Sequence, residues 1–209
     1  MKIIDFCAII LLFLITLITY YAANSIVFIL IQIFICICIT ICIYTYVLKN
    51  NARIDKLTSL YNRKYFDYIL SDKLKRLRSR ANLALLICDI DNFKLINDTY
   101  GHVTGDAVLA ELADILKANI RKSDTAYRYG GEEFAIIMPN TNCNEAEVVA
   151  MRIKKAVEKH YFKTNVTVTV SVGVAVTDYK VSAVDIVIKA DKALYIAKKQ
   201  KNTVVCLQM

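Results

Sequence analysis

The sequence predicts an α+β fold, with a mixed, mainly antiparallel central sheet flanked by helices and preceded by a two-helix transmembrane hairpin. Three observations support this prediction. Short apolar or β-branched runs bounded by turn residues recur after residue 80, as strands do. Helical periodicity separates some of these runs, and a glycine pair joins two others, which favours hairpins. The first 48 residues contain only two charged side chains, Lys2 and Asp5.

Two apolar stretches open the chain, at residues 3–21 and 26–48, joined by an uncharged segment at 22–25. Each is long enough to cross a bilayer core of ~30 Å as a helix. The alternative is a signal peptide followed by one span. The absence of a strongly basic start and the length of the first stretch argue against that alternative.

Basic residues that include Lys49 and Arg53 follow the second apolar stretch closely. The positive-inside rule then places both termini in the cytoplasm. We therefore expect a multi-pass protein of the bacterial cytoplasmic membrane. Residues 1–48 would form the membrane part, and residues 49–209 would form one cytoplasmic domain with a short linker.

The elements of residues 49–209 follow from hydrophobic patterns. Ala107, Val108, Leu112 and Leu116 share one face of a helix, and β-branched residues dominate 166–176. In chain order we expect a strand at 83–88, a helix at 104–120, strands at 126–129 and 134–138, a helix at 144–160, a strand-rich segment at 166–176, a helix at 182–199 and a strand at 203–207.

The net charge of +8 belongs to residues 49–209, since Lys2 and Asp5 cancel. A basic domain attracts polyanions such as nucleotides, nucleic acids or anionic lipids, so charge alone does not choose a function. Cys88, Cys143 and Cys206 show no metal-site spacing, and we expect reduced thiols rather than disulfides.

Carboxylates gather where two predicted strands begin or end. Glu132 and Glu133 follow Gly130-Gly131, a turn that lets backbone or ligand approach closely, and Asp89 ends the strand at 83–88. Hard oxygens at adjacent strand ends suit Mg²⁺, with Mn²⁺ as the alternative ion. Such ions serve phosphoryl transfer. Acidic residues that merely solvate a hairpin are the alternative.

Five ordered motifs set that alternative aside, because together they resemble the GGDEF family of diguanylate cyclases in its Glu-for-Asp variant. The resemblance covers residues 55–205 and implies a nucleotidyl-cyclase, palm-like form of the predicted sheet. The motifs occupy Asp55–Lys64, Asp89–Asp106, Gly130–Phe134, Val170–Ala175 and Ala190–Lys198.

The resemblance also implies a role for individual residues. Asp89, Glu132 and the Ile90 carbonyl would ligate the metal. Glu133 is a candidate base for the attacking hydroxyl, with Glu132 or a metal-bound water as alternatives. The substrate-binding residues implied are Asn97 and Asp106 for guanine, Lys94 and Lys198 for phosphates, the turn of Gly130 and Gly131, and His102. A structural hydrogen bond is the alternative for His102.

One segment departs from the family pattern. After Lys198 the family commonly carries a glycine and an arginine, whereas this chain continues Lys199-Gln200-Lys201-Asn202. Lys201 would stand in for the arginine after a one-residue deletion.

Arg121 and Asp124 lie where the family places an inhibitory product-binding motif, with five residues between Asp124 and Gly130. An arginine fork suits the phosphates and guanines of cyclic di-GMP. A surface salt bridge is the alternative interpretation of these two residues.

The resemblance thus implies an enzyme that condenses two GTP into cyclic di-GMP across a two-fold homodimer, with product inhibition and no nucleic-acid partner. The alternative is a catalytically inactive domain that senses cyclic di-GMP or GTP. The intact Asp89, Glu132 and Asn97 argue against it.

Overall fold

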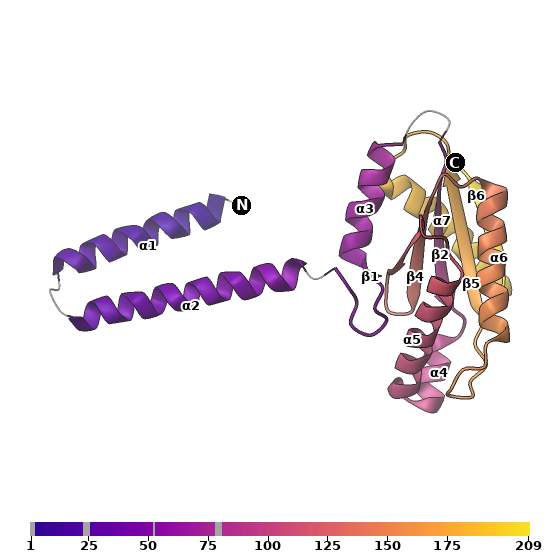
Figure 1. The fold of residues 1–209 in the computed structure, drawn as a ribbon, viewed down its shortest axis with the longest axis horizontal. Helices are drawn as coiled ribbons and strands as arrows, with labels where there is room; N and C mark the ends of the chain where they lie inside the picture. The colour runs from indigo at the N-terminus through magenta and orange to yellow at the C-terminus, as the bar shows by residue number, and fades with distance from the viewer. Residues whose placement is uncertain (1–2, 23–25, 52, 78–80) are drawn as a thin grey trace. The chain divides into compact units, whose positions relative to one another are not determined.

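A computed structural model describes residues 3–22, 26–51, 53–77 and 81–209, without the side chains of residues 3–8, 21–22, 27–28 and 46–51 (Figure 1). The chain divides into two compact units, Met1–Ala52 and Arg53–Met209. Each unit is described by itself.

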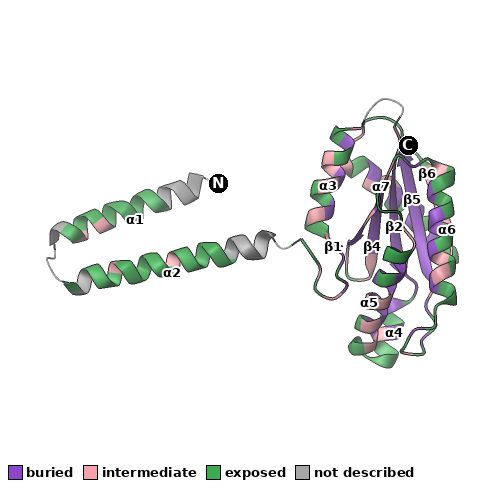
Figure 2. Ribbon diagram, viewed as in Figure 1, coloured by how far each residue is buried: buried purple, intermediate pink, exposed green. Residues whose placement is uncertain are grey.

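The first unit consists of two helices, α1 (Ile3–Ala22) and α2 (Ile26–Asn51). The amide of Gln32 on α2 donates a 2.6 Å hydrogen bond to the hydroxyl of Thr19 on α1. Most of the described side chains of both helices are exposed (Figure 2). The two helices therefore meet through a polar contact.

The transmembrane prediction is wrong. Within the described ranges, no helix combines the length and the apolar character that a bilayer crossing requires. The spans expected at 3–21 and 26–48 are therefore not supported, and neither is the placement in the bacterial cytoplasmic membrane. The apolar stretches indicated helices correctly, as α1 and α2. Residues 23–25 of the predicted connecting segment lie outside the described residues.

The second unit contains a six-stranded sheet in the order β1-β3-β4-β2-β5-β6. The sequence pattern did not predict β1, α3 or α4, and it placed the other elements within a few residues. The elements are β1 (Tyr61–Asn62), α3 (Arg63–Lys75), β2 (Leu83–Ile90), α4 (Phe93–Tyr100), α5 (His102–Ala118), β3 (Thr125–Arg128), β4 (Glu133–Pro139), α6 (Cys143–Lys159), β5 (Val170–Thr177), α7 (Ala183–Gln200) and β6 (Val204–Gln208).

Strand β2 lies at the centre of the sheet and is buried along its whole length. It pairs antiparallel with β4 on one side and with β5 on the other. Strands β3 and β4 form the hairpin around the glycine pair, while β1 and β6 add to the two edges in parallel. The expected mixed, mainly antiparallel sheet with helices packed on it is thus present.

The helices cover both faces of the sheet (Figure 1). Even-numbered side chains of β2, such as Leu86 and Cys88, pack with α4, α5 and α6. Odd-numbered side chains, such as Leu85 and Ile87, pack with α3 and α7. This alternation follows from the two-residue period of a strand. It assigns each residue at the strand ends to one face, including Asp89.

A disulfide bond joins Cys143, at the start of α6, to Cys206 in β6, across 63 residues of sequence. The expectation of reduced thiols is therefore wrong for this pair, although Cys88 is a free, buried thiol. Spacing along the chain could not indicate the bond, because the packing of α6 beside β6 creates it.

Gly173 in β5 lets the sheet approach α7 at backbone distance. A Cβ at this position would collide with the amide nitrogen of Leu194 and the carbonyl oxygen of Ala190. We expect Gly173→Ala to lower the free energy of unfolding by about 3 kcal/mol, because backbone cannot yield as a side chain can. Urea denaturation checks this. Gly131→Ala, with no atom within 4 Å of the added Cβ, is the control and should change stability by less than about 1 kcal/mol.

Candidate functional site

The candidate site lies where β2 ends. The register of the sheet sets Asp89 directly opposite Glu133 of β4 and Ser171 of β5. Directly opposed residues project from the same face of a sheet, here the face covered by α7. From α7, the ammonium of Lys198 donates a 2.7 Å hydrogen bond to Oδ2 of Asp89. The fold thus brings together a lysine and a carboxylate 109 residues apart.

The carboxylates of the site outweigh the cation. Burial raises the pKa of Asp89 from its ordinary value of 3.8 to about 6, against the opposing hydrogen bond and charge of Lys198. The negative charges of Glu132 and Glu133 contribute to this rise. For Lys198, burial works to lower the pKa, but the bond to Asp89 outweighs it and the net shift is upward. The site therefore favours an additional cation.

The donor set suits a divalent ion that is shared with a substrate. Among the described residues, no group of three or more His, Cys, Asp or Glu side chains lies close enough to hold a metal by itself. Mg²⁺ needs only one or two carboxylates when phosphates and waters complete its shell. The ammonium of Lys198 supplies a positive charge beside Asp89, and the backbone of Ile90 lies at the same strand end. The residues fit such an ion.

The turn of Gly130 and Gly131 is held from two sides. The backbone amides of Tyr129 and Gly130 both donate to the carbonyl of Glu133, at 2.8 and 3.0 Å. The Arg128 side chain donates from Nη2 to the Gly131 carbonyl at 2.9 Å. A Cβ on Gly130 would collide with the carboxylate of Glu133. The Glu133 side chain therefore folds back over the turn and would have to move if position 130 carried a side chain.

Arg128 also links this turn to the beginning of the unit. Its Nη1 lies 3.2 and 3.3 Å from the two carboxylate oxygens of Asp55. Asp55 accepts further hydrogen bonds from the amide and hydroxyl of Thr58. Partial burial works to raise the pKa of Asp55, but the bonds from Thr58 and Arg128 outweigh it and hold this pKa below its ordinary value. Arg128 thus has a carboxylate partner within the chain.

A second cluster forms between α4 and α5. The amide oxygen of Asn97 lies so close to Gly105 that a Cβ there would collide with it. Asp106 follows Gly105 and is exposed beside it. The structure therefore places the Asn97 amide beside Gly105, the residue that precedes Asp106. Lys94 and His102 are exposed on the same two helices.

The predicted product-binding residues lie between α5 and β3. Asp124 is buried and accepts hydrogen bonds from the Arg121 backbone amide at 3.0 Å and the Ser123 hydroxyl at 3.1 Å. The Arg121 side chain is exposed, and within the described residues no ion pair joins it to Asp124. The surface salt bridge considered for this pair is therefore absent there.

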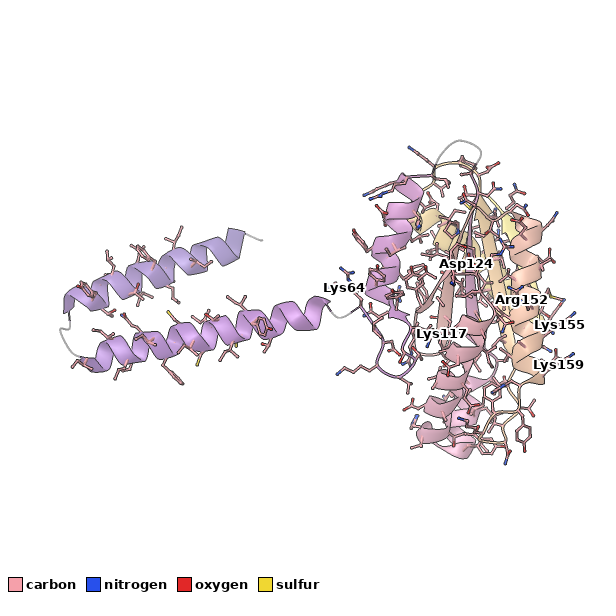
Figure 3. All side chains as sticks on the ribbon, in the orientation of Figure 1. Lys64, Lys117, Asp124, Arg152, Lys155 and Lys159 are labelled. Atoms are coloured by element: carbon pink, nitrogen blue, oxygen red, sulfur yellow. A yellow bond between two sulfur atoms is a disulfide. The ribbon has the colours of Figure 1, made fainter. Side chains whose placement is uncertain are left out.

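Arg152 on α6 is a neighbour that the sequence pattern did not indicate. Its Nη2 donates a 2.6 Å hydrogen bond to the carbonyl of Asn119, two residues before Arg121 (Figure 3). It also lines a hollow of about 670 Å³ on α6 with Asn144, Glu147, Val148, Met151 and Lys155. This hollow is separate from the carboxylates around Asp89, as its lining residues show.

Comparisons with known proteins agree with the resemblance. Residues 52–203 match the family model described as "Diguanylate cyclase, GGDEF domain". The chain is 44% identical over 161 residues to Diguanylate cyclase A of Treponema denticola, covering 73% of this chain and 43% of that protein. It is 39% identical over 158 residues to Diguanylate cyclase DgcZ of Escherichia coli, covering 74% and 53%. The chain thus spans about half the length of these relatives.

Solved structures share the fold of the second unit. The GGDEF domain of DgcB from Caulobacter crescentus, in complex with c-di-GMP, superposes with a TM-score of 0.70 at 33% identity, covering 75% of this chain and 96% of that one. The active GGEEF domain of a diguanylate cyclase from Vibrio cholerae superposes with a TM-score of 0.63 at 35% identity, covering 70% and 96%.

The raised pKa of Asp89 predicts a pH-dependent stability in metal-free protein. Between 3.8 and about 6 the unfolded chain has released the Asp89 proton while the folded chain retains it, so the free energy of unfolding falls as pH rises. The loss should be at most roughly 3 kcal/mol. Urea denaturation in the presence of a chelator, from pH 4 to 7, measures the free energy of unfolding of the wild type and of Asp89→Asn. The difference between the two gives the contribution of Asp89. A parallel comparison with the exposed Asp178→Asn should show no such slope.

Proposed function

Because the chain belongs to the GGDEF family, we propose that its second unit is a diguanylate cyclase domain that converts two GTP into cyclic di-GMP and two pyrophosphates. One observation carries the proposal. The sheet places Asp89 opposite Glu133, beside the glycine turn, and Lys198 reaches the same carboxylate. A lysine, several carboxylates and a glycine turn that allows close approach lie at one strand end. This combination suits a nucleoside triphosphate.

In this proposal the nucleotide base and its phosphates occupy different clusters. Asn97 and Asp106 bind guanine, because an amide and a carboxylate together can accept from the N1–H and N2–H₂ donors and donate to an acceptor. Lys94 and Lys198 hold phosphate oxygens as point charges. Gly130 and Gly131 allow the triphosphate to approach the backbone. His102, exposed beside this cluster, contacts the substrate.

Asp89, Glu132 and the Ile90 carbonyl would hold Mg²⁺ or Mn²⁺. The ion, when bound, neutralises charge on the phosphates during phosphoryl transfer. The positive charge of Lys198 would then be available to phosphate oxygens. Glu133 faces the site from β4 and is the proposed acceptor for the proton of the attacking 3′-hydroxyl, in agreement with its position over Gly130.

The reaction requires two such domains. Each would bind one GTP, and the two sites would face each other about a two-fold axis. Each 3′-hydroxyl attacks the α-phosphate of the other nucleotide, so that two ester bonds form and two pyrophosphates leave. A homodimer is therefore part of the proposal.

Product inhibition is proposed for the segment of Arg121 and Asp124. The exposed Arg121 guanidinium lies on a turn that the Asp124 carboxylate stabilises, and Arg152 adds a second guanidinium nearby. Cyclic di-GMP held there would favour an arrangement of the two domains in which their sites are apart.

Incubation of the purified protein with GTP and Mg²⁺ should yield cyclic di-GMP, measured by chromatography, and excess ATP should not compete. Glu132→Ala should reduce the rate by at least about 100-fold, because charge stabilisation in the transition state is lost. Asp178→Ala removes an exposed carboxylate far from these residues in the sequence and should retain the wild-type rate. Wild-type turnover by the Glu132 variant would contradict the assignment.

Arg121→Ala should leave the initial rate nearly unchanged but remove the slowing of the reaction as cyclic di-GMP accumulates. Coupling of this kind is about 1–3 kcal/mol, so the inhibition constant should rise by about 5–150-fold. Progress curves with added product measure it. Lys122→Ala removes the neighbouring positive charge and should remain inhibited. If excess product never slows the wild-type protein, the inhibitory site does not exist.

A further inference from the structure

Asp91 is a buried carboxylate for which the proposed chemistry has no role. It is 8% exposed and accepts three hydrogen bonds. The hydroxyls of Thr169 and Ser171 donate at 2.7 and 2.6 Å, and the backbone amide of Asn202 donates at 2.8 Å. The Asp91 amide in turn donates to the Thr169 carbonyl at 2.9 Å. The side chain and the backbone amide of Asp91 therefore bond to the residue before β5, to β5 itself and to the turn after α7.

The bond from Asn202 connects two turns that are far apart in sequence. The first is the turn from β2 into α4, at Asp91 and Asn92, and the second is the turn from α7 into β6, at Lys201 and Asn202. A second bond joins the same turns, from Nζ of Lys201 to Oδ1 of Asn92 at 2.8 Å. Two hydrogen bonds therefore hold one turn against the other.

Both turns adopt backbone conformations that disfavour ordinary side chains. Asn92, Lys201 and Asn202 have φ values of 56°, 55° and 44°, and none of them is a glycine. Such conformations cost free energy and persist only where the surrounding contacts determine them. The side chain of Asn202 has its own contacts on α6, where it accepts from Lys154 and donates to Glu158, each at 2.9 Å. The strained turn is thus fixed by contacts on two sides.

These turns adjoin a residue proposed to hold the metal ion and a residue proposed to hold the phosphates. Asp89 lies two residues before Asp91 on the first turn, and Lys198 lies three residues before Lys201 on the second. The 2.7 Å bond between Lys198 and Asp89 therefore spans the same gap that the Asp91–Asn202 bond closes. Any change in the separation of the two turns would change this pairing.

We propose that Asp91 and the Asn202 amide form a latch that positions Asp89 for the metal ion and Lys198 for the nucleotide phosphates. The latch itself contacts no substrate, so both are positioning residues. The inference rests on the proposed function, because it concerns the same phosphate-binding strand end.

The test compares Asp91→Ala with Asp91→Asn in the full-length protein. Alanine leaves the Asn202 amide and two hydroxyls without their acceptor, and the KM for GTP should rise roughly tenfold with a smaller change in kcat. Asparagine retains an oxygen for the Asn202 amide, and Ser171 can reorient to accept, so the KM should stay within about threefold of wild type. A wild-type KM in Asp91→Ala would overturn the latch.

Glu111→Ala is the matched control. Glu111 accepts from the His160 side chain at 2.9 Å and from the Lys163 amide, so it too is a carboxylate that ties a loop, but none of these bonds involves the two turns. Glu111→Ala should lower the melting temperature about as much as Asp91→Ala does, but it should not raise the KM for GTP. An equal rise in KM in this variant would show that general destabilisation explains the effect.

Asn202→Gly separates the backbone bond from the side chain. Glycine keeps the amide donor to Asp91 and tolerates positive φ, so the KM should remain within about threefold of wild type. A rise equal to that of Asp91→Ala would assign the positioning to the α6 contacts and overturn the latch.

Two further measurements keep the test decisive. Should Asp91→Ala fail to fold, Thr169→Val with Ser171→Ala removes the two hydroxyl bonds that orient the Asp91 carboxylate toward the Asn202 amide, so the KM should rise, and an unchanged KM would count against the latch. Wild-type turnover is measured first. Its absence would contradict the proposed function, whereas normal turnover with an unchanged KM in the variants contradicts only the latch.

Discussion

The antiparallel register of β2 between β4 and β5 is the constraint on which the rest of the site depends. It is the register that sets Asp89 opposite Glu133 and Ser171. A slip of one residue would turn every side chain of β2 to the other face, moving Asp89 away from α7 and Lys198. The complete burial of β2 prevents such a slip, because both faces carry apolar side chains fitted to different helices.

The site holds more negative charge than its own cation compensates. Burial and the neighbouring Glu132 and Glu133 raise the pKa of Asp89 even with Lys198 bound to it. A domain that lacked a ligand would gain stability by replacing this carboxylate, since a buried charge is costly when it is incompletely paired. The arrangement is consistent with a centre that is completed by a bound cation and phosphates.

Two connections from outside the site hold its turns. The Asp55 carboxylate binds Arg128, which also donates to the Gly131 carbonyl, so the start of the unit supports the glycine turn. The Asp91 carboxylate accepts a hydrogen bond from the Asn202 amide. Both connections join residues more than 70 positions apart in sequence. The turns at the strand ends are therefore held by contacts between residues distant in sequence, and not by their own local sequence.

The sequence by itself determined most of the architecture. Short apolar or β-branched runs indicated the strands, and the Gly130-Gly131 pair indicated the β3–β4 hairpin. Hydrophobic periodicity indicated α5, α6 and α7, because these patterns reflect local geometry. The short β1 and α4 carried too few residues for a periodic signal. The apolar stretches of α1 and α2 indicated helices, but the membrane spans expected there are not supported among the described residues.

The motifs of the GGDEF family also predicted roles for Asp89, Asn97 and Asp106 before any geometry was known. Only the tertiary structure decided which residues support them. The disulfide between Cys143 and Cys206, the Asp55–Arg128 pair and the Asp91–Asn202 bond all join distant segments. No local pattern encodes such contacts, because they arise from the packing of one element on another.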